Sequence, residues 1–205
     1  MSSTLAECGD AGGTADAEPP ARDATAPPLA LEVQRACDAA DLPDDDQLRA
    51  WVQAALAEGL AQPRPAALTL RIVDADEGAE LNRHYRGRTG PTNVLSFPFE
   101  PPSGVPPEAL DALGAELESD LAAQLGDIVI CAPVLRREAE AQGKPLAAHT
   151  AHLVVHGTLH LLGFDHIDPA EASEMEALET AILGGLGFST PYEVPEEPDD
   201  ERPSA

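Results

Sequence analysis

Residues 156–166 read His-Gly-Thr-Leu-His-Leu-Leu-Gly-Phe-Asp-His, and this stretch decides the fold. An α-helix repeats about every 3.6 residues, so His156 and His160 lie one turn apart on the same face. Gly163 can end that helix by adopting a left-handed conformation that residues with a Cβ adopt at a cost. The chain then turns, so that His166 can come back toward the first two histidines.

This histidine group is typical of a metal site. Half of the six histidines of the chain fall within these eleven residues. Such clustering would not be expected if two histidines of a helix and one of a loop stood there by chance. Three protein ligands with one open position are the pattern of a catalytic zinc site, and such an ion lowers the pKa of a bound water. We therefore predict that His156, His160 and His166 bind one Zn²⁺, a place that other divalent transition metals can also take.

One position separates this stretch from a peptidase motif. The spacing matches the metzincin pattern H-E-x-x-H-x-x-G-x-x-H except that Gly157 stands where these enzymes carry glutamate. That glutamate is the general base of the peptidase, and glycine cannot accept a proton. The metal ligands are thus predicted to be present without the usual peptidase base.

Hydrophobic periodicity predicts an α+β fold, a small mixed sheet of about four strands covered by about five or six helices. Strands are predicted at residues 29–35, 68–73, 92–99 and 126–131, and Pro98 makes the third of these an edge strand or a strand end. Helices are predicted at residues 44–59, 76–85, 133–142, 146–161 and 169–186. The helix before Leu161 is apolar nearly all round, so we expect it to be the central, buried helix and to hold its histidines firmly.

Composition indicates one domain with loose ends. Residues 29–192 are predicted to form a single catalytic domain. The flanking residues 1–28 and 193–205 are acidic and too poor in large apolar residues to fold. We therefore expect a disordered N-terminal tail and a loose C-terminal tail. Residues 100–125, rich in proline, acids and alanine, read as a surface insertion with a weak helical pattern. No apolar run spans a membrane and no secretory signal is visible, and three widely spaced cysteines suit a reducing cytoplasm.

The net charge of −25 argues against a nucleic-acid partner only if it is spread evenly. It is not, because 17 of the 37 acidic residues fall in residues 1–28, 100–120 and 193–205. Residues 81–99 contain Arg83, Arg86 and Arg88 and no acid, so the local field there can be positive.

Arg86 is the candidate catalytic residue outside the histidine stretch. A guanidinium offers paired donors to phosphate oxygens and can stabilise the charge that develops when a phosphodiester is cleaved. Alone it would be read as a surface arginine, but its place in a basic, glycine-rich loop favours function.

Four further residues have less specific readings. His152 lies one turn before His156. It could have a functional role, by lining the cleft or orienting a ligand, or it could be a core or surface histidine with a local hydrogen bond. His149 is expected at the surface near the helix start. Asp165 could orient an imidazole or act as a base, but holding the turn is favoured. Asp127 is expected to bond to nearby backbone.

With these residues in view, the chain resembles the YbeY family of bacterial metal-dependent endoribonucleases. The resemblance covers residues 29–192. It rests on the stretch at residues 156–166, on Leu-Asn-x-x-Tyr-Arg-Gly at residues 81–87 and on Pro-Thr-Asn-Val-Leu-Ser-Phe-Pro at residues 91–98. Gly-Asp-Ile at residues 126–128 and Met-Glu-x-Leu-Glu at residues 175–179 also fit.

The resemblance implies a single-strand-specific endoribonuclease that acts in late maturation of the 3′ end of small-subunit (16S) rRNA and in ribosome quality control. It implies His156, His160 and His166 as zinc ligands, Arg86 as the functional arginine, and single-stranded rRNA and the small ribosomal subunit or its assembly factors as partners, with no DNA and no membrane. Two alternatives stay open, namely a zincin-type metallopeptidase, which Gly157 disfavours, and a non-catalytic ribosome-assembly factor with a structural metal.

Overall fold

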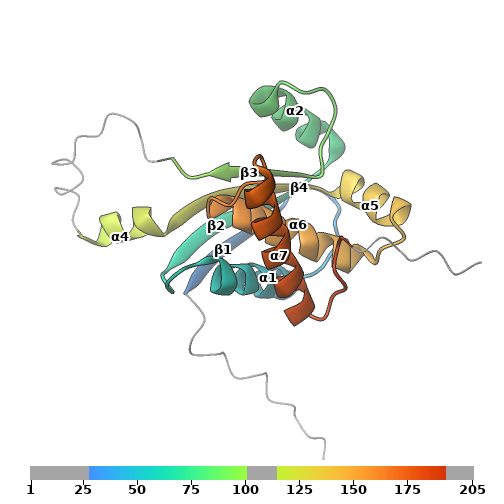
Figure 1. Ribbon diagram of the computed structural model, residues 1–205. Coiled ribbons are helices and arrows are strands. Elements are labelled where there is room, and N and C mark those ends of the chain that lie inside the picture. The colour runs from blue at the N-terminus through green and yellow to red at the C-terminus, as the bar shows by residue number, and fades with distance from the viewer. Residues whose placement is uncertain (1–27, 101–114, 193–205) are drawn as a thin grey trace, which may run out of the picture.

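The computed structural model describes residues 28–100 and 115–192 (Figure 1). The two acidic tails, apart from residue 28, lie outside the described residues, as does most of the predicted insertion. The elements in chain order are β1 (Leu29–Arg35), α1 (Asp45–Gly59), β2 (Ala66–Val73), α2 (Ala75–Arg86), β3 (Val94–Pro98), α4 (Ala115–Ala123), β4 (Gln124–Cys131), α5 (Ala132–Ala141), α6 (Leu146–Leu161) and α7 (Pro169–Gly185).

The four strands form one mixed sheet in the order β1-β2-β4-β3. The β1·β2 and β2·β4 pairs are parallel, whereas β3 pairs with β4 in the antiparallel direction. The predicted α+β class is confirmed, and so is the edge position of β3, because Pro98 lacks the N–H that a second neighbour would require. Strand β4 begins at Gln124, two residues before the predicted start, because its first residues continue the parallel pairing with β2.

Helices lie on both faces of the sheet. Figure 1 shows α1, α6 and α7 grouped on one side of the strands and α2 on the opposite side. Strand β4 explains this arrangement, because Ile128 and Ile130 belong to the large apolar cluster with α1 and α6, while Val129 and Cys131 belong to a smaller cluster that includes Leu81 of α2. Alternate side chains of one strand therefore serve two layers, which is why its sequence reads as almost continuously apolar.

Helix α6 is the central helix, as its sequence predicts. It contacts α1, α5, α7, β3 and β4, and ten of its 16 residues are buried. On this helix His156 and His160 are half-buried, so the surrounding packing fixes their backbone while one side of each ring stays accessible.

Aspartate side chains cap three of the helices. The Asp44 side chain accepts the N–H of Gln47 in a capping box, Asp74 accepts the N–H of Glu77, and Asp168 accepts the N–H of Ala170 at 2.8 Å. Each carboxylate satisfies a backbone donor that has no partner within its helix and favours the positive end of the helix dipole. Among residues 28–100 and 115–192, no helix is both long and apolar enough to cross a membrane.

Candidate metal centre

The turn after α6 brings the third histidine back. Gly163 has φ +94°, and the N–H of Phe164 bonds to the carbonyl of Leu159 at 3.1 Å, which closes the end of the helix as predicted. Asp165 then accepts the N–H of His166 at 2.7 Å through its Oδ1 atom. Asp165 therefore holds the turn, the reading that the sequence favoured.

The three histidines converge. Nε2 of His156 and Nε2 of His160 lie 3.1 Å apart, and candidate ligand atoms of these two residues and His166 all lie within 4.8 Å of one another. The ring of His166 is 5.6 Å from that of His156 and 5.0 Å from that of His160, measured between centroids. The side chain of His166 is 56% exposed, so the group is open to solvent on one side.

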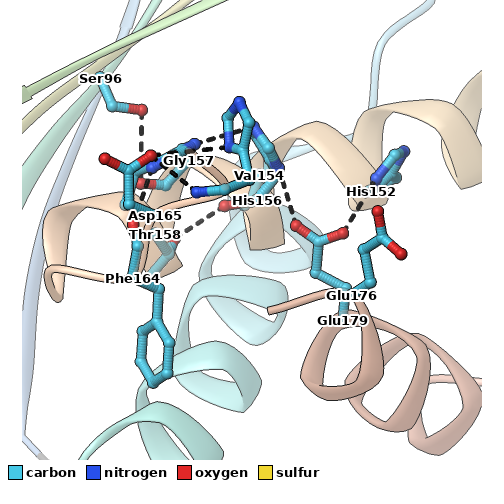
Figure 2. A network of polar contacts seen from close by, with 12 residues as sticks. Ser96, His152, Val154, His156, Gly157, Thr158, Phe164, Asp165, Glu176 and Glu179 are labelled. Atoms are coloured by element: carbon cyan, nitrogen blue, oxygen red, sulfur yellow. Dashed lines mark hydrogen bonds and ion pairs between the residues drawn. The ribbon is translucent and has the colours of Figure 1, made fainter. Parts of the chain in front are cut away.

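The opposite nitrogens of the two helix histidines are both engaged (Figure 2). Nδ1 of His160 lies 2.9 Å from the carbonyl oxygen of Phe164, and Nδ1 of His156 lies 2.7 Å from Oε1 of Glu179. A carbonyl only accepts, so Nδ1 of His160 must carry the proton, and a carboxylate partner assigns the proton of His156 to Nδ1 in the same way.

These tautomers leave two nitrogen lone pairs facing each other at 3.1 Å. Burial and the neighbouring imidazole of His156 lower the pKa of His160, which favours its neutral form. Two neutral acceptors at this distance repel each other, whereas a cation between them satisfies both. The donor set therefore fits a divalent metal ion, with the outer hydrogen bonds that metal-bound histidines normally make.

Glu179 of α7 is the part of this centre that the sequence alone did not single out. Its side chain is fully buried, with Oε1 on His156 and Oε2 accepting the hydroxyl of Tyr192. Burial would raise the pKa of this carboxyl, but its polar contacts with His152, His156 and Tyr192 outweigh burial and lower the pKa to about 2. The available signal was its spacing, since Glu179 lies four residues after Met175 and three before Ile182, on the apolar face of the helix.

The two earlier histidines of α6 lie behind the metal centre. Nε2 of His152 is 3.4 Å from Oε2 of Glu179 without hydrogen-bond alignment, so this residue contacts the outer shell of the site. His149 is only 4% exposed, with Nε2 3.0 Å from Oε2 of Glu138 on α5. The prediction of a surface position for His149 is wrong, because the packing of α5 against the start of α6 covers it.

Gly157 faces the sheet. A Cβ atom at this position would lie 3.1 Å from Cγ2 of Ile128 and 3.3 Å from Oγ of Ser96. Ser96 also approaches the backbone of the helix, with its hydroxyl 3.4 Å from the carbonyl oxygen of Gly157 (Figure 2). A glutamate side chain has no space here, so the absence of the peptidase base follows from the way α6 packs on β3 and β4.

The accessible sides of His160 and His166 open into a depression of about 740 Å³. Its walls come from the end of α2, from β3 and from the turn after α6. The lining residues are Arg86, Arg88, Ser96, Pro98, His160, Gly163, Phe164, Asp165, His166 and Ile167. The tertiary structure thus brings Arg86 beside two of the predicted metal ligands, His160 and His166, although more than 70 residues of sequence separate them.

The loop that carries the two arginines is anchored from within. Asn82 is 4% exposed, and its Nδ2 donates to the carbonyl of Gly90 at 2.7 Å. Arg86 and Arg88 are exposed and form no ion pair within the described part of the chain. Both guanidinium groups are therefore available to a ligand while their backbone is held in place.

Asp127 differs from its prediction. It was expected to bond to nearby backbone, but its side chain is exposed and makes no hydrogen bond among residues 28–100 and 115–192. Asp127 lies in β4 between β2 and β3, so the nearby backbone N–H and C=O groups are already hydrogen-bonded between strands.

Comparison with known proteins gives a consistent result. A family model described as "Endoribonuclease YbeY" matches residues 33–187. The chain is 54% identical over 173 residues to "Endoribonuclease YbeY" of Alkalilimnicola ehrlichii, covering 84% of this chain and 96% of that protein. It is 49% identical over 178 residues to the protein of the same name from Alcanivorax borkumensis, covering 86% and 94%. Among solved structures, the solution structure of TM1509 from Thermotoga maritima aligns with a TM-score of 0.46 and 19% identity, covering 80% of this chain and 99% of that one.

Proposed function

This chain belongs to the YbeY family, and we propose that it is a metal-dependent endoribonuclease that cleaves single-stranded RNA. The observation that carries the proposal is the shared depression, in which Arg86 and Arg88 stand beside His160 and His166. Metal-ligating nitrogens and unpaired guanidinium groups on one surface suit a phosphodiester, which needs both a Lewis acid and fixed positive charge.

We assign Zn²⁺ as the metal and His156, His160 and His166 as its ligands. Three imidazole nitrogens suit zinc better than calcium or magnesium, which prefer oxygen ligands. A zinc ion held there supplies Lewis-acid chemistry, by activating a water or by polarising a phosphate oxygen. Glu179 and the carbonyl of Phe164 fix the orientation of the two helix imidazoles.

Arg86 and Arg88 hold the phosphate. The planar guanidinium donates two parallel hydrogen bonds to phosphate oxygens and keeps its charge at any physiological pH. Asp165 is the one carboxylate among the described residues that line the depression, and its Oδ1 is engaged with the N–H of His166. Stabilisation of developing charge therefore carries the rate more than a dedicated protein base, and the substrate 2′-hydroxyl can contribute as a nucleophile.

The surface beside the depression suits unpaired bases. Tyr85 precedes Arg86 at the end of α2 and is 61% exposed, with its ring 4.7 Å from that of Phe97 on β3. Ile167, which also lines the depression, is 85% exposed. An exposed aromatic ring supported from behind, next to arginines, is the arrangement on which bases of a single strand stack, whereas a duplex keeps its bases covered.

We further propose that the cellular substrate is small-subunit rRNA, trimmed at its 3′ end in the cytoplasm, with the small ribosomal subunit or its assembly factors as partner. Residues 81–99 have three arginines and no acid in an otherwise acidic chain, so an RNA strand meets positive charge at this edge. The assignment to late 16S maturation and ribosome quality control rests on the family, whereas the local charge supports an RNA ligand in general.

The test is cleavage of a single-stranded rRNA fragment by the zinc-loaded full chain. Wild type is compared with Arg86→Ala, His160→Ala and Arg137→Ala, the last being an exposed arginine of α5 outside the depression. We expect wild type and Arg137→Ala to cut, Arg86→Ala to lose about 100-fold in rate and His160→Ala to be inactive. Annealing a complementary strand should protect the RNA, and the same sequence as DNA should stay intact.

Equal cleavage by all four proteins would identify a contaminating nuclease and overturn the proposal. Zinc binding by the wild type without cleavage of any single-stranded RNA would favour the non-catalytic assembly factor instead. Hydrolysis of casein by the wild type, lost in His160→Ala, would restore the peptidase alternative.

A further inference from the structure

The segment 188–192, here called the C-terminal strap, returns along α7 toward the metal helix. Gly187 turns the chain with φ +83°, and the N–H of Phe188 then bonds to the carbonyl of Leu183 at 2.9 Å. Oγ1 of Thr190 lies 3.4 Å from Oγ1 of Thr180. These contacts hold the strap against α7.

A second anchor joins the strap to the chain just before α6. Lys144 donates from Nζ to the carbonyl of Pro191 at 2.9 Å. The strap is therefore held both by α7 and by the segment before α6. These two anchors place the next residue, Tyr192, beside Glu179 of α7.

Tyr192 faces the outer shell of the metal centre. Its hydroxyl donates to Oε2 of Glu179, and its ring packs edge-on against that of His152 at 5.9 Å. The side chain is still 44% exposed, so it adds little to the apolar core. Burial and the carboxylate of Glu179 raise the pKa of the phenol, which keeps the hydroxyl protonated as a donor.

Glu179 needs this donor to hold its orientation. Oε1 is fixed by Nδ1 of His156 at 2.7 Å, but the alternative donor for Oε2, His152, stands at 3.4 Å without alignment. Without the Tyr192 hydroxyl, a fully buried carboxylate would keep one well-formed hydrogen bond and could rotate. The ring of His156, which takes its orientation from Glu179, would then lose part of its own restraint.

We propose that Tyr192 is a positioning residue of the metal centre, which acts through Glu179 on the orientation of His156. The inference rests on the metal site of the proposed function. Tyr192 lies beyond residue 187, where the match to the family model ends. In this way the C-terminal strap links the end of the folded domain to the affinity of the metal site.

The experiment measures zinc affinity of the full chain without RNA, by competition with a chromophoric chelator, and records the ligand-field spectrum of the Co²⁺ form. The variants are Tyr192→Phe, Glu179→Gln and the double variant. The matched control is Tyr85→Phe, which removes the same hydroxyl from the other of the two tyrosines of the chain. Thermal unfolding of each metal-free protein separates loss of metal affinity from loss of fold.

We expect Glu179→Gln to weaken zinc binding by about 10- to 100-fold and Tyr192→Phe by about tenfold, with an altered Co²⁺ spectrum in both. Tyr192→Phe should have no further effect in the Glu179→Gln background, because its action passes through that carboxylate, and Tyr85→Phe should bind as the wild type does.

Unchanged affinity and spectrum in Tyr192→Phe, or an equal loss in both backgrounds, would overturn the inference while leaving the proposed function intact. A wild type that binds no zinc would overturn both, whereas a wild type that binds zinc and cuts no RNA would overturn the proposed nuclease alone.

Discussion

Gly157 lies against Ile128, so closely that a Cβ on the glycine would stand 3.1 Å from Cγ2 of the isoleucine. The contact is where α6 crosses β4, and it sets how near the histidine helix comes to the sheet. A side chain at position 157 would have to displace Ile128 or lift the helix, and with it His156 and His160.

The Gly157→Glu variant should therefore be destabilised and should not become a peptidase. We expect a loss of about 3 kcal/mol or more in the free energy of unfolding, because the substitution overpacks the interface and buries a charge. Denaturant unfolding measures this. Gly184→Glu, at an exposed helical glycine with open space around it, is the control and should stay within about 1 kcal/mol of the wild type. A well-folded Gly157→Glu protein would contradict the packing argument.

Metal should stabilise the wild type and fail to stabilise His156→Ala or His160→Ala. A ligand that binds only the folded state adds about 2.7 kcal/mol at about 100 times its dissociation constant. Each variant removes one of the two facing nitrogens, which lie 3.1 Å apart. Thermal unfolding with added zinc and with chelator gives the comparison, and an equal zinc-induced shift in wild type and variants would refute the assigned ligands.

Removal of the third predicted ligand, His166, should lower zinc affinity without lowering the stability of the metal-free protein. His166 is 56% exposed on a turn, and the turn is held by Asp165 rather than by the imidazole. In the metal-free protein His166→Ala should change the free energy of unfolding by less than about 0.5 kcal/mol, as surface substitutions do. Zinc affinity should nevertheless fall clearly. Equilibrium dialysis together with denaturant unfolding tests both halves, and wild-type zinc affinity in this variant would remove His166 from the ligand set.

His149 should make the metal-free protein less stable in mild acid. Burial lowers the pKa of His149 from 6.5 although its hydrogen bond to Glu138 opposes this, and His152 and Lys144 also disfavour the charge. The unfolded chain therefore takes up this proton at a higher pH than the folded chain does. The stability contributed by neutral His149 is present above about pH 6.5 and is lost as pH falls toward the folded pKa.

The measurement is the free energy of unfolding at several pH values between 7.5 and 5, in chelator, for wild type and His149→Gln. The wild type should lose stability more steeply than the variant over this range. Parallel curves for the two proteins would show that His149 protonates equally in both states.

Tyr85 should matter for RNA binding and not for folding. Its ring is 61% exposed and rests on Phe97. Tyr85→Ala should weaken binding of a single-stranded RNA by about 1–3 kcal/mol, whereas Tyr85→Phe should bind like the wild type because the stacking face is kept. Binding is measured by fluorescence anisotropy with metal removed, so that no cleavage intervenes. An unaffected Tyr85→Ala protein would move base stacking to another part of the surface.

Much of the architecture was readable from local chemistry. The alternation of residues 29–35 and the glycine at position 163 each specify a backbone conformation through neighbours in sequence, and each appears as predicted. The aspartates at 44, 74 and 168 cap their helices through equally local contacts. The burial of His149 and the hydrogen bonding of Asp127 were misjudged because both depend on which elements pack around the residue. A helix start can be exposed or covered, and α5 decides this for His149.

The sequence by itself determined the spacing of His156, His160 and His166, the glycine in place of the peptidase glutamate and the acid-free arginine loop, because helical periodicity and turn chemistry are local properties. Tertiary structure alone decided that Arg86 shares a depression with His160 and His166, that Gly157 faces Ile128, and that Glu179 and Tyr192 stand behind His156. Such contacts join elements far apart along the chain, and only the packing of α2, α6 and α7 around the sheet sets their distances.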